Sequence, residues 1–175
     1  IGGAANLDNT GEDVNKAFTA QTSGVIYSSF IVQTQSTNSV GYFFHLGQAA
    51  IGSTFFTRVY VNATGTGIGL SGSAAPASYT AISANTPTLV VVKYDIATKV
   101  SSLYVLNSFS STEPGAPDAT FTETATITSV GTVALRQYSA SQRVIVDGIR
   151  VGKTWGDAVT SGISINATGT LSSLT

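Results

Sequence analysis

Apolar and polar residues alternate along most of this chain with a period of two, the pattern of β-strands whose side chains point to opposite faces of a sheet. Turn residues, mainly Gly, Pro, Asn and Ser, separate the alternating segments. Strands are therefore predicted at 14–20, 25–35, 40–46, 55–62, 68–71, 79–82, 88–95, 100–107, 119–127, 132–138 and 144–153. Apolar residues do not recur at helical spacing, so a single helical turn is expected, at 156–159. About a dozen short strands indicate an all-β chain, a two-sheet antiparallel β-sandwich of the jelly-roll type.

One strand, 144–153, carries an irregularity that the alternation makes visible. Its apolar residues fall on even positions up to Val146 and on odd positions from Ile149, so the apolar face changes across Asp147-Gly148. One extra residue in a strand has this effect, and a glycine supplies the backbone geometry of a bulge. A late, central, bent strand is predicted here.

Two other segments indicate how the sheets are covered. The strand at 25–35 carries apolar residues on both faces, which fits a strand covered on both sides or one that crosses between sheets. The segments 88–95 and 100–107 form the strongest hairpin signal, a Val-rich strand followed by a Leu/Tyr strand across a short turn.

The length of 175 residues suits one domain with a core of its own. We expect the jelly-roll domain to span 1–160. The Ser/Thr-rich segment 161–175 is expected to form a final strand, a linker or an assembly segment. Because the chain starts at Ile1, we expect it to be a mature or excised piece of a longer precursor.

Charge and cysteine content limit the possible functions and partners. Charged residues make up 10% of the chain and the net charge is -1, so no nucleic-acid partner is expected. The longest aliphatic run, 89–92, is far too short to cross a bilayer, so no membrane insertion is expected. The absence of Cys excludes disulfides, a thiolate nucleophile and Cys-type metal sites. Polarity comes from Ser, Thr, Asn and Gly, a balance typical of extracellular β-proteins.

Five stretches together resemble a known class of domains. They are 7–18 (LDNTGEDVNKAF), 42–47 (YFFHLG), 58–61 (RVYV), 134–137 (ALRQ) and 146–155 (VDGIRVGKTW). They are similar to laminin-G-like, concanavalin-A-like jelly-roll modules of large bacterial secreted or surface-anchored proteins. The resemblance covers about 7–159 and implies an extracellular or cell-surface location. Relatives on this fold bind glycans, adhere to surfaces or hydrolyse glucans, so the resemblance does not specify one activity.

Catalysis is the least favoured of these activities. Hydrolytic relatives use a Glu-x-Asp-x-x-Glu arrangement on one strand, because a retaining glycosidase needs two carboxyl groups about 5 Å apart. This spacing is missing from the sequence, and the adjacent pair Glu12-Asp13 would point to opposite faces of a strand. We therefore expect a non-catalytic module and keep a glycoside hydrolase as the weaker alternative.

Candidate sugar-binding residues are aromatic and planar polar side chains that share a strand face, because aromatic rings stack on pyranose rings while arginines bond hydroxyls. Two alternating groups fit, with two further residues expected to border them: Phe56, Arg58 and Tyr60; Arg136 and Tyr138; and His45 with Trp155. The alternative is structural, with Tyr and Arg covering a sheet through their long apolar stems and His45 hydrogen-bonded within a sheet face.

A structural Ca²⁺ ion is a further expectation, since jelly-roll modules of the resembled type often bind one through carboxylates and carbonyls. The candidate ligands are Asp8, Asn9, Glu12, Asp13 and Asp147. An ion there would attach the N-terminal loop to the late strand. The favoured alternative needs no ion, with Asp8 capping a turn and Asp147 bonding backbone amides at the bulge.

The leading hypothesis is a non-catalytic extracellular module of a bacterial surface or secreted protein that binds a glycan or cell-surface polysaccharide, or mediates adhesion. The alternative is a structural subunit or spacer of a surface assembly that self-associates by strand addition through its termini.

Overall fold

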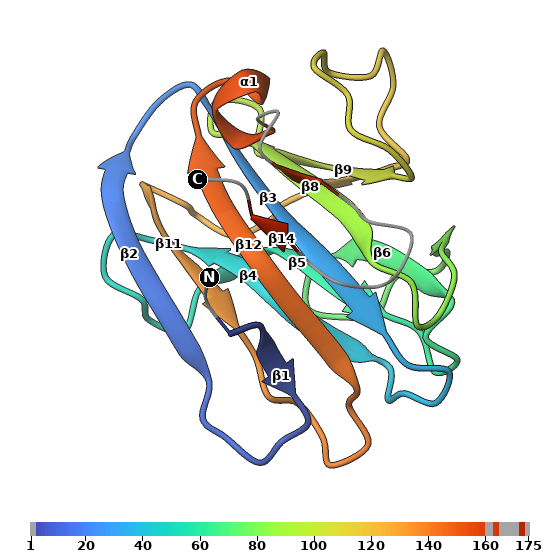
Figure 1. Cartoon of the computed structure of the whole chain (residues 1–175). Helices are drawn as coiled ribbons and strands as arrows, with labels where there is room; N and C mark the ends of the chain where they lie inside the picture. The colour runs from blue at the N-terminus through green and yellow to red at the C-terminus, as the bar shows by residue number, and fades with distance from the viewer. Residues whose placement is uncertain (1–2, 160–162, 165–171, 174–175) are drawn as a thin grey trace.

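Two six-stranded antiparallel sheets face each other in the computed structural model, which describes residues 3–159, 163–164 and 172–173 (Figure 1). In spatial order, sheet A contains β1 (Ala5–Leu7), β12 (Val144–Gly152), β3 (Val25–Thr34), β8 (Thr88–Asp95), β9 (Val100–Leu106) and β10 (Ala119–Thr122). Sheet B contains β2 (Val14–Gln21), β11 (Val130–Leu135), β4 (Gly41–Gly47), β5 (Phe55–Val61), β6 (Gly67–Ser71) and β7 (Thr80–Ala81). The predicted all-β sandwich is confirmed.

The core lies between the two sheets and is rich in aromatic side chains. Phe30 of β3 stacks on Phe44 of β4 with ring centroids 4.5 Å apart, and meets Phe43 edge-on at 6.0 Å. All three side chains are fully buried. Contacts of this kind join sheet A to sheet B, because β3 and β4 belong to different sheets.

The strand β3 is covered on both faces, as its sequence predicted. Its inner face contributes Phe30 to the core, and its outer face contributes Tyr27 and Ile31 to a second apolar cluster. The helical turn α1 (Trp155–Ala158) completes that cluster on the outside of sheet A (Figure 1). Thr154 accepts a hydrogen bond from the backbone of Asp157, whose side chain bonds the Thr154 amide in return, so a capping box starts the turn.

The bulge in β12 is also confirmed. The register with β3 shifts between Asp147 and Arg150, and Gly148 has a φ of 63°, a backbone region that favours glycine. The boundaries differ elsewhere. The expected strand at 119–127 ends at Thr122, and β1 forms inside the N-terminal segment that lacked a strand signal.

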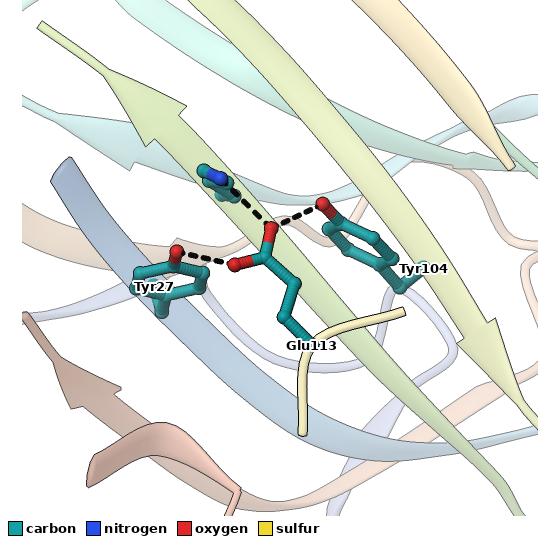
Figure 2. A network of polar contacts seen from close by, with 4 residues as sticks. Tyr27, Tyr104 and Glu113 are labelled. Carbon is teal, nitrogen blue, oxygen red and sulfur yellow. Dashed lines mark hydrogen bonds and ion pairs between the residues drawn. The ribbon is translucent and has the colours of Figure 1, made fainter. Parts of the chain in front are cut away.

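A polar network attaches the 107–118 loop to the outer side of sheet A (Figure 2). The Glu113 carboxylate accepts hydrogen bonds from Tyr27 at 2.7 Å and Tyr104 at 2.5 Å, and from Lys93 at 2.8 Å. Burial alone would raise the pKa of Glu113, but these three donors outweigh it and lower the pKa. Trp155 Nε1 donates to the Ser110 carbonyl at 2.9 Å, so the loop is held at two points.

Little of the C-terminal segment is described. β13 (Ile163–Ser164) pairs antiparallel with β14 (Ser172–Ser173). The rest of 161–175 lies outside the described residues, so its role as strand, linker or assembly segment stays a prediction. Within the described ranges, no helix combines the length and the apolar character needed to cross a membrane.

Candidate functional site

A bulge in β4 brings an aromatic pair to the outer face of sheet B. Tyr42 pairs with Tyr60 of β5, and the next paired residue, Phe44, faces Val59, so β4 contains one extra residue at Phe43. Phe43 and Phe44 consequently both point into the core. Tyr42 and His45, three positions apart, then lie together outside, with ring centroids 5.8 Å apart.

A second bulge, in β5, has the opposite sense. Leu46 pairs with Phe56 while Phe44 pairs with Val59, so β5 holds one residue more than β4 over this stretch. Phe56 lies in the core 5.0 Å from the Tyr94 ring, and the Thr57 side chain bonds Ser101 of sheet A at 2.8 Å. The prediction that Phe56 shares a face with Arg58 is therefore wrong. The extra residue in β5 reverses the alternation of inward and outward side chains between Phe56 and Arg58.

Glu123 holds the second bulge in place. Thr57 has a φ of 53°, a strained value for a β-branched residue. Its backbone N–H donates to the Glu123 carboxylate at 2.7 Å, and the Ser101 hydroxyl donates to the same oxygen at 3.2 Å. Glu123 is 6% exposed, and burial raises its pKa. The polar bonds of this buried carboxylate thus stabilise the bulge that turns Arg58 outward.

Seven side chains form what we call the outer cluster, on the outside of sheet B: Tyr42, His45, Phe55, Arg58, Tyr60, Arg136 and Tyr138. The His45 and Phe55 rings lie 4.3 Å apart, and Tyr42 contacts Tyr60 at 5.6 Å. His45 and Tyr60 are buried at the base of the cluster, whereas Tyr138 is 44% exposed. The cluster therefore has a packed floor and an accessible rim.

Arg136 lies between two tyrosine rings. Its guanidinium carbon is 4.2 Å from the Tyr42 ring centre and 4.5 Å from that of Tyr138. The chain continues β11 far enough for the Arg136 amide to donate to the Phe43 carbonyl, which sets the position of the side chain beside β4. Tyr138 in turn lies against Gly41, where a Cβ atom would come within 2.5 Å of the ring. A larger residue at Gly41 would displace Tyr138.

Arg58 completes the cluster from β5. Its guanidinium carbon lies 5.2 Å from the Tyr42 ring centre and 5.8 Å from that of Phe55. The ion pair found among the described residues joins Lys93 to Glu113, so neither Arg58 nor Arg136 has a carboxylate partner within 4 Å there. The Nε atom of Arg58 is buried and has no hydrogen-bond partner in the same part of the chain.

His45 is neutral at physiological pH. Burial lowers its pKa from 6.5 to about 4, although a backbone hydrogen bond opposes the shift. Nδ1 lies 3.1 Å from the Leu46 carbonyl oxygen, which can only accept, so Nδ1 carries the proton. The imidazole then offers Nε2 as an acceptor. His45 contributes no charge to the outer cluster.

Protonation of His45 is expected to oppose folding. Because its folded pKa lies below the unfolded value of 6.5, the unfolded chain takes up the proton first, and stability falls as the pH decreases from 6.5 to about 4. The expected loss is about 3 kcal/mol over this window. Urea unfolding at several pH values measures it. His45→Gln should lack this contribution, and equal pH slopes in both proteins would contradict the buried, neutral imidazole.

A shallow hollow of about 200 Å³ adjoins the cluster. It lies between the start of β2 and the near ends of β4 and β5, and it is lined by Asp13, Val14, Asn15, His45, Ile51, Gly52, Phe55, Ala134 and Leu135. It is smaller than the roughly 300–1,000 Å³ of enclosed ligand sites. A ligand would lie across this face and would not be engulfed.

The structure brings together five of the seven sequence-predicted sugar-binding residues: His45, Arg58, Tyr60, Arg136 and Tyr138. Trp155, expected to border them, lies on the outer side of sheet A, 5.2 Å from the Tyr104 ring. Sequence reasoning missed Tyr42 and Phe55. The run Tyr42-Phe43-Phe44 breaks the alternation just as Asp147-Gly148 does, so it could have revealed the first bulge.

The candidate calcium ligands do not gather at one point. Asp8 accepts hydrogen bonds from the backbone and side chain of Thr10, which caps a turn, and Asp147 bonds the Gly148 amide. Because Leu7 pairs with Val144, Asp8 lies about four residues, or roughly 13 Å, along the strand from Asp147. Within the described ranges, no three His, Cys, Asp or Glu side chains are placed to hold a metal.

The N-terminal loop is attached by a glutamine. The backbone N–H of Asn9 donates to the Gln137 side-chain oxygen at 2.7 Å, and the backbone N–H of Gln137 donates to the Asp13 carboxylate at 2.7 Å. The exposed Glu12 has no described role in this attachment. Calcium binding by Asp8, Asn9, Glu12, Asp13 or Asp147 stays a prediction.

No protein-family model matches the sequence, and no curated protein matches it. Among solved structures the chain is similar to a sialidase at 12% identity, with a TM-score of 0.53, over 83% of this chain and 14% of that one. It is also similar to Trypanosoma rangeli sialidase in complex with the inhibitor DANA, at 16% identity and a TM-score of 0.51. That match covers 74% of this chain and 20% of the sialidase. A complex of the same sialidase with 2,3-difluoro-KDN has 14% identity and a TM-score of 0.51, and the match covers 78% of this chain and 22% of that one.

These similarities concern the fold alone, because the identities are low. The chain spans between 14% and 22% of the length of these sialidases. They support a jelly-roll β-sandwich, the class of protein to which this chain belongs by its architecture. They do not single out the laminin-G-like type, which stays a prediction.

Proposed function

We propose that this chain is a non-catalytic, extracellular carbohydrate-binding module that holds a glycan on the outer cluster. The observation that carries the proposal is the position of Arg136 between Tyr42 and the exposed Tyr138. Contact with the two rings restrains the guanidinium group, whose N–H donors can bond hydroxyl groups. An exposed tyrosine ring beside these donors offers the flat apolar surface on which a pyranose ring stacks.

The surroundings of the described carboxylates support a non-catalytic role. The hollow next to the cluster contains one carboxyl group, that of Asp13, which is bonded to the Gln137 amide. Glu123 is bonded to Thr57 and Ser101, and Glu113 is paired with Lys93. Most retaining and inverting glycosidases use two cooperating carboxyl groups at the scissile bond, and sialidases, which use a tyrosine nucleophile, are an exception. The resemblance to modules of bacterial secreted and surface proteins supports a location outside the cell.

Replacing Tyr138 with alanine is expected to weaken glycan binding about tenfold, because a stacked aromatic ring contributes roughly 1–2 kcal/mol. Folding should be unaffected, since the side chain is 44% exposed. Affinity electrophoresis and calorimetry against a panel of bacterial and host polysaccharides measure the effect.

The matched control is Phe109→Ala, which removes an aromatic ring of similar exposure, 38%, from the 107–118 loop. Its binding should equal that of the unmodified chain. An equal loss in both variants would place the site elsewhere, and binding to no polysaccharide would overturn the proposal. Release of reducing sugar during the assay would contradict the non-catalytic part.

A further inference from the structure

We infer that the ligand of the outer cluster is an acidic saccharide whose carboxylate is held between Arg58 and Arg136, above the Tyr42 ring. This inference rests on the proposed function and specifies its ligand class. It starts from charge. The whole chain carries a net charge of -1, yet the accessible part of the outer cluster concentrates two arginines that have no carboxylate within 4 Å among the described residues.

The balance of charge on this face is positive. Arg58 and Arg136 stay protonated at every physiological pH. His45 is neutral, because burial lowers its pKa to about 4. Asp13 is the carboxylate that lines the adjoining hollow, and its oxygen is already bonded to the Gln137 amide. Glu123 is close enough to Arg58 for the arginine to oppose the rise in its pKa, but it is buried on the core side. At the surface two cations thus face one anion, so the face attracts a negatively charged ligand.

The distances fit one carboxylate. Both guanidinium carbons lie near the same ring, that of Tyr42, at 5.2 Å for Arg58 and 4.2 Å for Arg136, so their separation cannot exceed the sum of these values. A carboxylate bonded to a guanidinium at about 2.8 Å has its carbon roughly 4 Å from the guanidinium carbon. One carboxylate can bridge both arginines when the two guanidinium carbons lie within about 8 Å of each other, a separation inside the range that the shared ring allows.

The aromatic rings restrain both guanidinium groups. The guanidinium carbon of Arg136 lies within 4.5 Å of the Tyr42 and Tyr138 ring centres, and that of Arg58 lies within 5.8 Å of the Tyr42 and Phe55 ring centres. Hydrogen bonds from a guanidinium lie in its plane, so stacking against its faces preserves them and restricts their direction. Preorganised arginines lose little freedom on binding, and the rest of a sugar ring can then rest against the exposed Tyr138.

The test compares acidic and neutral polysaccharides and includes one pair with the same backbone. Polygalacturonate and its fully methyl-esterified form share a backbone, and hyaluronan and colominic acid extend the acidic set, with dextran and galactan as neutral polymers. We expect the acidic members to bind at least tenfold more tightly than the ester and neutral members at 150 mM NaCl, and binding to weaken at 500 mM NaCl.

Arg58→Gln and Arg136→Gln are each expected to reduce binding of the acidic polymers roughly ten- to hundredfold. Arg136→Lys, which keeps the charge but loses the planar fork, should restore part of the loss. Lys153→Gln is the charge-matched control, because Lys153 is exposed and lies between β12 and α1, away from sheet B. Asp13→Asn should strengthen binding a few-fold, since it removes the opposing charge.

The outcomes separate the ligand class from the proposed function. Equal binding of neutral and acidic polymers, lost in Tyr138→Ala, would overturn the acidic ligand and leave the proposed function standing. If binding of the acidic polymers fell equally in Lys153→Gln and Arg136→Gln, the attraction would be general to positive charge, and the acidic ligand of the outer cluster would also be overturned. Binding to no member would overturn both. Circular dichroism of each variant confirms that the fold is retained.

Discussion

Phe30→Ala is expected to lower the free energy of unfolding by about 4 kcal/mol, because a fully buried phenylalanine leaves a cavity when it is truncated. Phe30 stacks on Phe44 and meets Phe43, so it joins β3 of sheet A to β4 of sheet B. The cavity would open between the sheets, where the bulged part of β4 packs.

Urea unfolding followed by tryptophan fluorescence measures this change, with Trp155 as the single reporter. Phe109→Ala again serves as the control, and its exposed ring should cost less than about 0.5 kcal/mol. A loss below about 1 kcal/mol for Phe30→Ala would contradict the position of Phe30 between the two sheets.

Glu123→Ala is expected to cost about 4 kcal/mol at pH 7 and to weaken glycan binding as well. The substitution leaves the Thr57 amide without its acceptor and removes one bond of the Ser101 hydroxyl, and each unpaired buried group costs about 1–3 kcal/mol. A cavity adds to this loss. Since Thr57 holds a strained φ of 53°, the bulge in β5 should relax and move Arg58 out of position.

Glu123→Gln is the informative partner, because the amide keeps one acceptor oxygen of the same shape for Thr57. Glu123→Gln should lose less than half as much stability as Glu123→Ala, and its affinity for the glycan should be close to that of the unmodified chain. Unfolding free energies and calorimetric affinities for both variants give the answer. If Glu123→Ala reduced stability with no change in affinity, the link between the β5 bulge and the outer cluster would be wrong.

The course of β12 shows how much a single sequence can reveal. Its apolar residues change parity at Asp147-Gly148, and a glycine stands where a positive φ is needed, so the bulge was predictable from local pattern alone. In β5 the equivalent signal is missing. Thr57 is a β-branched residue that rarely adopts a positive φ, and a buried acceptor 66 positions away stabilises that conformation.

The same difference explains the prediction of the site. The expected strand at 132–138 ends at Leu135, but Arg136 and Tyr138, two positions apart just after it, still share a face as their spacing predicted. Phe55 and Tyr42 belong to the outer cluster because two bulges of opposite sense compensate each other between β4 and β5. The run 42–44 carries a signal for the β4 bulge, but the β5 bulge that compensates it depends on a hydrogen bond from a distant segment, which the sequence of β5 does not encode.

The sequence by itself determined the all-β class, the positions of most strands, the two apolar faces of β3, the helical turn and the bend in β12, because each follows from side-chain periodicity or local backbone preference. Only the tertiary structure decided which aromatic rings face outward, that Trp155 lies on sheet A, and that Arg58 and Arg136 both lie next to the Tyr42 ring. These features arise from pairing and burial between distant segments, where one extra residue reverses the face of every side chain that follows.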